Sequence, residues 1–189
     1  MNQLKGNQNF SKAKIIRIVK DLIKKRKIII GSRIAKDNVL DNPFRRRIYE
    51  YILNNPGSTN YDIRKFFDVG ANQIIWHLNF LRKFKFIRII EIEKHKVIFS
   101  LNSDPKYDLI YYCFANEKIK SILEIFKQKE DPLSPSDISN LLSMHYNTVN
   151  KNLERLRELK IIELIKEKKR KKYILDYKRY NEIMHNKKE

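Results

Sequence analysis

Two stretches of this sequence carry amide, hydroxyl and basic side chains at helical spacing. In the first stretch these residues are Asn72, Gln73, Trp76 and Asn79. In the second they are Tyr146, Asn147, Thr148, Asn150, Lys151 and Arg155. Asn and Gln can pair bidentately with adenine, and Arg or Lys can pair with guanine. Such side chains on one face of a helix indicate hydrogen bonding to base edges in a DNA groove.

Two short basic clusters follow these stretches, each at a polar break between β-rich runs. The first consists of Lys94, His95 and Lys96, and the second of Lys168, Lys169, Arg170, Lys171 and Lys172. Such clusters bind phosphate without sequence choice, or reach the flanking minor groove. A solvated hairpin tip that blunts a strand edge is the alternative. The clusters recur in register, which favours DNA contact.

The elements that would position the first set are two short helices and a hairpin over residues 58–101. Thr59 followed by Asp62 fits a capping box at the start of a helix, and Ile63, Phe66 and Phe67 form the apolar stripe of that helix. Gly70 allows a tight turn before a second apolar stripe with helical spacing. A β-branched run from Phe86 to Ile92 then pairs with a second run across the basic tip. This order is typical of a winged helix-turn-helix, a module that usually reads DNA.

A further helix precedes this module, because Asn42 offers an N-cap and Pro43 fits the first helical position. Its apolar stripe is Phe44, Ile48, Tyr51 and Ile52, and we expect Arg45, Arg46 and Arg47 on its other, solvent-facing side. The apolar pattern then recurs at a shift of 75 positions, so that Ile63 falls on Ile138 and Phe66 on Leu141. The preceding helix needs a shift of 74. Matching without gaps over about 30 residues indicates an internal repeat of one structural unit.

We therefore predict a mainly α chain with small β-hairpin wings, an α+β fold made of two tandem winged helix-turn-helix domains. The predicted organisation is a basic N-terminal tail and amphipathic helix over 1–40, a first winged-helix domain over 41–101, a linker helix over 102–115, a second winged-helix domain over 116–176 and a C-terminal helix or tail over 177–189. Within the first of these segments, residues 14–27 have Ile, Val and Leu on one face and Lys and Arg on the other. This helix could dock on the first domain, pair with a second copy or lie on a membrane surface.

Composition narrows the class of partner. Lys and Arg number 41 against 22 Asp and Glu, a net charge of +19, which favours nucleic acid first and an acidic membrane surface second. We expect no membrane span and no signal peptide, since no apolar run is long enough. Cys113 is the single cysteine, so no intramolecular disulfide can form, and we expect a buried structural thiol in a cytoplasmic protein. No phosphate loop, metal-ligand spacing or catalytic constellation is present, so we predict neither a cofactor, nor a metal, nor an enzyme.

Several stretches resemble archaeal winged helix-turn-helix transcriptional regulators. Asp41-Asn42-Pro43-Phe44-Arg45-Arg46-Arg47-Ile48-Tyr49 is similar to the entry of that fold, and Trp76-His77-Leu78-Asn79-Phe80-Leu81 is similar to the "HL..L" recognition helix of ArsR-like proteins. Residues 147–156 are similar to the recognition helix of MarR-like modules. The resemblance implies a regulator that binds double-stranded DNA. The cysteines of metal-sensing relatives have no counterpart here, so metal sensing is not implied.

Some positions admit two interpretations. Trp76 could contact sugar or a thymine methyl, but packing within the fold is favoured, and His77 is expected to support the helix. The apolar Ile75, Trp76 and Phe80 leave open a winged-helix scaffold for protein contacts, like the ESCRT-II subunits. A general transcription or chromatin factor without operator preference is a third reading. The chain could act as a pseudo-dimer or form a homodimer.

Overall fold

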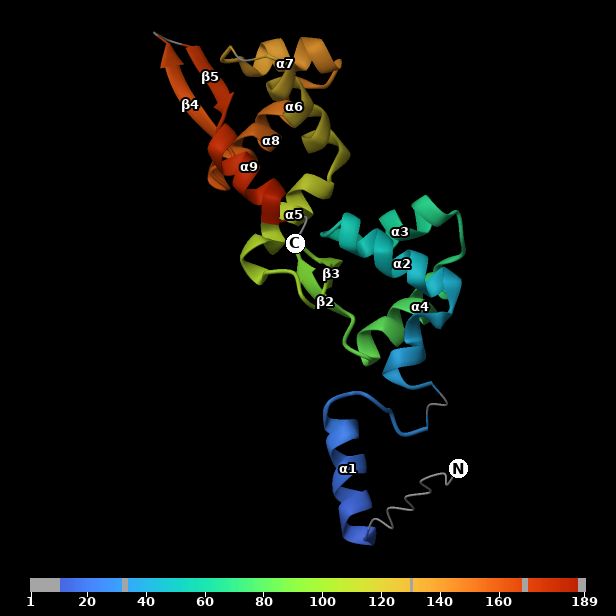
Figure 1. Ribbon diagram of the computed structural model, residues 1–189. Helices are drawn as coiled ribbons and strands as arrows, with labels where there is room; N and C mark the ends of the chain where they lie inside the picture. The colour runs from blue at the N-terminus through green and yellow to red at the C-terminus, as the bar shows by residue number, and fades with distance from the viewer. Residues whose placement is uncertain (1–10, 32–33, 130, 168–169, 187–189) are drawn as a thin grey trace, which may run out of the picture.

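The computed structural model describes residues 11–31, 34–129, 131–167 and 170–186. Figure 1 shows an elongated arrangement in which the chain rises from helix α1 (Lys12–Lys24) through an N-terminal unit (residues 42–101) to a C-terminal unit (residues 116–176). The short helix η1 (Lys36–Asp41) precedes the N-terminal unit. Helix α1 lies within the segment over 1–40 that was predicted to carry the N-terminal helix, and η1 crosses the end of that segment.

The N-terminal unit consists of three helices and a three-stranded antiparallel sheet. Its elements are α2 (Pro43–Asn54), β1 (Ser58–Thr59), α3 (Asn60–Phe67), α4 (Ala71–Lys83), β2 (Ile87–Ile92) and β3 (His95–Ser100). The strand order is β1-β3-β2. Asn42 caps α2, and Thr59 with Asp62 forms the expected capping box on α3. A left-handed Asp68 ends α3 and allows the turn into α4.

The C-terminal unit has the same order of elements. They are α6 (Glu117–Gln128), α7 (Pro135–Leu142), α8 (Tyr146–Glu158), β4 (Ile162–Glu167) and β5 (Arg170–Leu175). Leu133 pairs with Tyr173 of β5, as Ser58 of β1 pairs with Ile98 of β3. Between the units lie η2 (Pro105–Tyr107) and α5 (Asp108–Ala115), and α9 (Tyr177–Asn186) follows the C-terminal unit.

The two units coincide element by element at a shift of 75 residues. Helices α4 and α8, the capping boxes at Thr59 and Ser134, and the left-handed residues Asp68 and Ser143 all differ by that number. Only α2 and α6 differ by 74. The fold class predicted from the sequence, mainly helical with small antiparallel hairpins, is confirmed.

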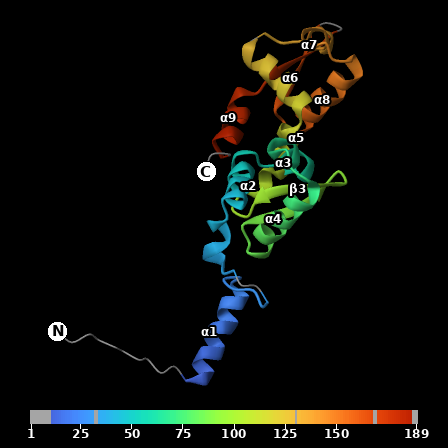
Figure 2. The same ribbon diagram turned by 90° about the vertical axis from the view of Figure 1, so that its right-hand side faces the viewer.

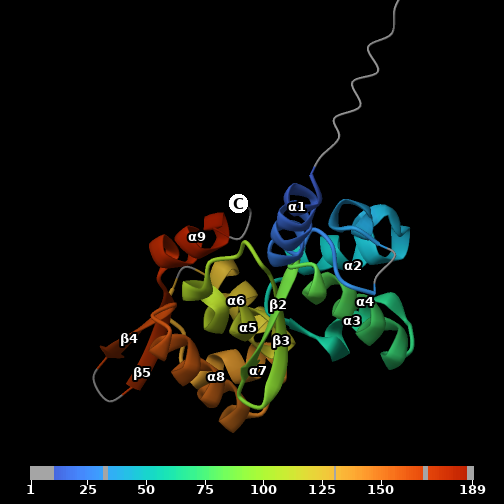
Figure 3. The same ribbon diagram turned by 90° about the horizontal axis from the view of Figure 1, so that it is seen from below.

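Strand β3 contributes to two hydrophobic cores. Its side chains alternate between the faces of the sheet, so that Ile98 joins the core of the N-terminal unit while Val97 and Phe99 join that of α5 and the C-terminal unit. Figure 3 shows the β2–β3 hairpin between the two units, whereas the β4–β5 hairpin projects at the edge of the molecule. The two hairpins therefore have different surroundings despite the same local structure.

Three expectations from the helical pattern were wrong. Arg45 was placed on the solvent side of α2 but is 2% exposed, because it shares the inward face with Ile48 and Ile52. Phe66 and its counterpart Leu141 were placed in apolar stripes but are 64% and 48% exposed. Each lies three residues after a fully buried isoleucine in an eight-residue helix, at the edge of a contact face too narrow to cover it.

Candidate nucleic-acid interface

Helix α8 presents a polar, open surface over its N-terminal half. Tyr146, Asn147 and Lys151 are exposed, and Thr148 and Asn150 are half-buried. Among the residues that the structure describes, none makes a hydrogen bond or an ion pair with the side chains of Asn150 or Lys151. Amide and ammonium groups left open in this way are available for base edges or phosphates.

The opposite face of α8 holds the helix in place. Val149, Leu153 and Leu156 are fully buried in the core of the C-terminal unit. The hydroxyl of Tyr173 on β5 donates to Glu154 Oε1 at 2.7 Å, and this bond lowers the pKa of Glu154. The pKa of Tyr173 is raised to about 12, mainly by burial and in addition by the same hydrogen bond. The phenol therefore stays protonated near neutral pH. The helix and its wing are therefore joined by both packing and a charge-assisted hydrogen bond.

Arg155, expected on DNA, is engaged within the chain. Its Nη2 lies 3.1 Å from Oε1 of Glu93, at the turn of the β2–β3 hairpin. Its guanidinium also lies over the ring of Tyr112 on α5, 5.3 Å from the centroid. The C-terminal half of α8 thus contacts the wing of the other unit.

Helix α4 presents a different surface at the matching positions. Ile75 and Trp76 are 43% and 51% exposed where α8 has Asn150 and Lys151. Asn72 and Gln73 are exposed in its first turn, whereas Asn79 is half-buried and accepts a long bond from Arg82, 3.5 Å. The exposed face of α4 is therefore polar at its start and apolar along its middle.

Trp76 packs on residues of its own unit while leaving one side open. The buried guanidinium of Arg45 lies 5.2 Å from the Trp76 ring and 4.5 Å from the Phe80 ring. Arg45 also donates to the carbonyl of Val39 at 2.7 Å. These cation–π contacts, together with the His77 ring 4.7 Å away, give Trp76 a structural role.

His77 is buried beneath this surface, as expected for a residue that supports the helix. Only 6% of the side chain is exposed, and its ring packs edge-to-face on Phe44 at 5.1 Å. Burial, aided by the positive charge of Arg45, lowers the pKa of His77 below 6.5. The imidazole is therefore neutral near pH 7 and acts as a packing residue.

The two basic tips differ in what surrounds them. Lys94, His95 and Lys96 are exposed on the N-terminal wing, and the His95 ring lies 6.2 Å from that of Tyr112. On the C-terminal wing Lys171 is exposed and Lys172 half-buried. Lys168, Lys169 and the side chain of Arg170 lie outside the described residues.

Contacts around α5 fix the N-terminal wing to the rest of the chain. The guanidinium of Arg88 on β2 binds both carboxylate oxygens of Asp108, with Nη2 2.6 Å from Oδ1, and the pair is largely buried. The same guanidinium contacts Ser103 and lies over the Phe99 ring. A Cβ at Gly57 would lie 2.5 Å from the backbone of Tyr111, so α5 approaches the N-terminal unit too closely for any side chain there.

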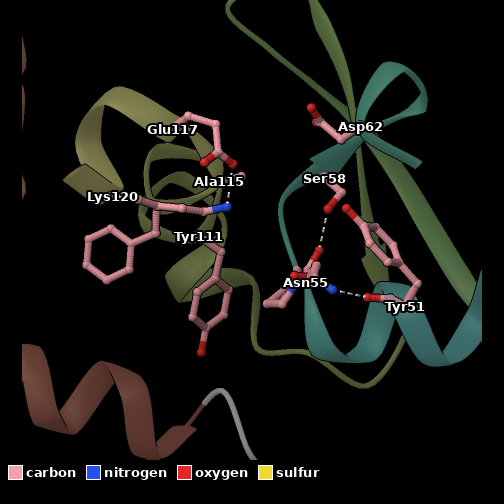
Figure 4. A pocket seen from close by; sticks show the side chains of 10 residues that line it. Tyr51, Asn55, Ser58, Asp62, Tyr111, Ala115, Glu117 and Lys120 are labelled. Atoms are coloured by element: carbon pink, nitrogen blue, oxygen red, sulfur yellow. Dashed lines mark hydrogen bonds and ion pairs between the residues drawn. The ribbon is translucent and has the colours of Figure 1, made fainter. Parts of the chain in front are cut away.

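Two hollows adjoin these elements. Figure 4 shows the cleft between Tyr51, Ser58 and Asp62 on one side and Tyr111, Glu117 and Lys120 on the other; its volume of about 70 Å³ admits a few waters. A groove of about 500 Å³ runs between α4 and the N-terminal wing, with Ile75, Asn79 and Lys96 among its lining residues. No three His, Cys, Asp or Glu residues of the described chain are grouped to hold a metal ion.

The single cysteine and the hydropathy of the helices also bear on the chain's chemistry. Burial raises the pKa of Cys113 to about 11, so it remains a thiol near neutral pH. In the described segments, no helix combines the length and apolar character needed to cross a bilayer.

Sequence reasoning missed the residues that join the units. Arg88, Asp108, Glu93 and Tyr112 were not singled out, because each pairs with a partner distant in sequence. Arg45 could have been found, since it lies three residues before Ile48 on the buried face of α2.

The chain matches no family model. It is 31% identical over 153 residues to an uncharacterised HTH-type transcriptional regulator of Methanocaldococcus jannaschii. That match covers 79% of this chain and 38% of the relative, so the chain spans well under half of the relative's length. A match over that share of the chain includes residues of both units.

Proposed function

We propose that this chain is a cytoplasmic, DNA-binding transcription regulator with two tandem winged helix-turn-helix domains. Helix α8 would lie in the major groove with its N-terminal residues on base edges, and the C-terminal wing would contact phosphates or the flanking minor groove. The observation that carries this proposal is the open surface of Asn147, Asn150 and Lys151 on a helix whose other face is fully buried.

Two further findings support this reading. The relative from Methanocaldococcus jannaschii is named an HTH-type transcriptional regulator, and the match covers 79% of this chain. The net charge of +19 suits a polyanionic partner. The ArsR-like and MarR-like resemblances of the two recognition helices agree with the same class of partner.

Helix α4 would make the second, less polar contact with DNA. Asn72 and Gln73 in its first turn could reach base edges, while Trp76 would lie against sugar or a thymine methyl. The Arg88–Asp108 pair and the shared core at β3 would hold α4 and α8 in fixed relation. A single chain could then act as a pseudo-dimer on successive half-sites, roughly 34–36 Å apart.

Selection from a random duplex library tests the proposal. The purified chain is incubated with the library at two salt concentrations, and retained DNA is sequenced. We expect an enriched motif that persists at the higher salt. Retention without a motif, fading steeply with salt, would instead indicate a general or chromatin-coating factor. No retention at moderate salt would overturn DNA binding altogether.

A winged-helix scaffold for protein contacts is the second candidate. It is favoured by one observation, the exposure of Ile75 and Trp76 at positions where a DNA-reading helix usually carries polar groups. If it is correct, the unaltered chain would retain no DNA at moderate salt in the same selection.

A further inference from the structure

Helix α1 leaves an apolar face uncovered. None of its residues is buried, and Ile15, Ile16, Ile18 and Val19 are each between 39% and 49% exposed. Figures 1 and 2, which view the chain from two sides, both show α1 standing apart from the two units. An isolated helix of 13 residues is marginal in water, so a surface that covers this face would stabilise it.

From Lys14 onward the helix separates apolar and basic side chains by face, whereas Lys12 in the first turn lies within the apolar arc. With 100° between successive residues, Ile15, Val19 and Leu22 mark the centre of an apolar arc of roughly 160°. Basic residues occupy the opposite arc: Lys14, Arg17, Lys20 and Lys24. Lys25 continues that face and pairs with Asp21 at 2.8 Å. Lys20 and Lys25 lie at the two edges of the basic arc. There their methylene chains can extend along an apolar surface while the ammonium groups stay in water.

The charge of the helix decides between possible partners. Residues 12–27 contain eight Lys or Arg and one Asp. A second copy of α1 would cover the apolar face but bring two such segments together in chains that each carry +19. DNA would neutralise the basic face and leave the apolar one in water. An anionic lipid surface satisfies both faces, since acyl chains take up the apolar arc and headgroups neutralise the basic one.

We propose that α1 is an interfacial helix that lies in the plane of an anionic lipid surface. Its isoleucine and valine side chains enter the boundary between headgroups and acyl chains, and its lysines and arginine contact lipid phosphates. The chain would thereby hold its winged units next to a membrane. The proposal does not rest on DNA binding, because α1 lies outside both winged units.

Sedimentation with vesicles tests this inference. The full chain is mixed with vesicles of phosphatidylglycerol and phosphatidylcholine, or of phosphatidylcholine alone, in moderate salt. The test variant is the double substitution Ile15→Ser with Val19→Ser, which keeps the charge and removes apolar area. The matched control is Leu109→Ser, which removes a side chain of similar exposure, 45%, from α5. Since α1 buries nothing against the units, the double variant should fold normally, as circular dichroism would verify.

We expect the wild type and Leu109→Ser to sediment with the anionic vesicles and much less with the neutral ones. The double variant should bind the anionic vesicles about tenfold more weakly, because two buried apolar side chains are lost. If the double variant bound the anionic vesicles as tightly as the wild type, the proposal would be overturned, because general charge attraction would then account for the binding. Absence of wild-type binding would overturn it as well. A dimer in sedimentation equilibrium that the double variant loses would identify a second copy as the partner instead.

Discussion

Helices α4 and α8 have the same length, the same place in their units and the same relation to a following hairpin, yet their exposed faces differ. Where α8 carries Asn150 and Lys151, α4 carries Ile75 and Trp76. The cores beneath are equivalent, with Ile74 and Leu78 matching Val149 and Leu153. A repeat therefore preserves the residues that build the helix and lets its outer face diverge toward a separate task.

The two hairpins also differ, in the contacts that they make with the rest of the chain. The N-terminal wing is held between the units by Arg88, Asp108 and the contact of Glu93 with Arg155. In the C-terminal wing the position of Arg88 is taken by Glu163, which is exposed. We infer that the N-terminal wing mainly joins the units, while the C-terminal wing is left to contact a partner.

The largest expected effect is on stability, and it concerns the joining role of the N-terminal wing. Replacing Arg88 with Met leaves the carboxylate of Asp108 buried without its bidentate partner. We expect the free energy of unfolding to fall by about 3 kcal/mol, measured by urea denaturation. The matched change Glu163→Gln in the other wing should alter it by less than about 0.5 kcal/mol. Equal losses of stability from the two changes would contradict the claim that only the N-terminal wing joins the units.

A smaller effect should separate the wings in DNA binding. Replacing Lys171 with Ala should weaken binding to all duplexes alike and reduce the slope of log K against log salt by about one. The corresponding Lys96→Ala change in the N-terminal wing should reduce the slope less. Titration of a labelled duplex at several salt concentrations measures both slopes. A greater loss from Lys96→Ala would reverse our assignment of the wings.

The smallest effect is a pH dependence confined to the N-terminal unit. Burial lowers the pKa of His77, so below about pH 6.5 the unfolded chain binds a proton that the folded chain resists. The stabilisation is complete above that pH and declines as the pH falls toward the folded pKa. The matching residue of the other unit is Asn152, which does not titrate. We expect His77→Asn to flatten the dependence of the free energy of unfolding on pH between about pH 7 and 5. An unchanged slope would show that other groups cause this dependence.

Local patterns in the sequence predicted much of the fold. The capping boxes at Thr59 and Ser134 and the apolar stripes of α4 and α8 depend on residues a few positions apart, so they could be read directly. The exposure of Phe66 could not, because it depends on how wide a face its neighbours cover. Arg45 was misplaced because its charge was given more weight than its periodicity.

The candidate interface was predicted only in part, for a related reason. The open residues Asn147, Asn150 and Lys151 follow from helical spacing, since the buried face of α8 defines the outer one. The engagement of Arg155 by Glu93 joins residues from different units, and no local pattern indicates it. Long-range ion pairs become visible only once the units are placed together.

The central claim is that α8 reads DNA sequence and α4 contributes less. The most direct test compares two double variants at matching positions, Asn150→Ala with Lys151→Ala and Ile75→Ala with Trp76→Ala, on the duplex most enriched from the random library. We predict that the α8 variant loses at least about tenfold in affinity and most of its preference over an unrelated duplex. The α4 variant should retain that preference. Loss of preference in the α4 variant with the α8 variant unaffected would contradict the account.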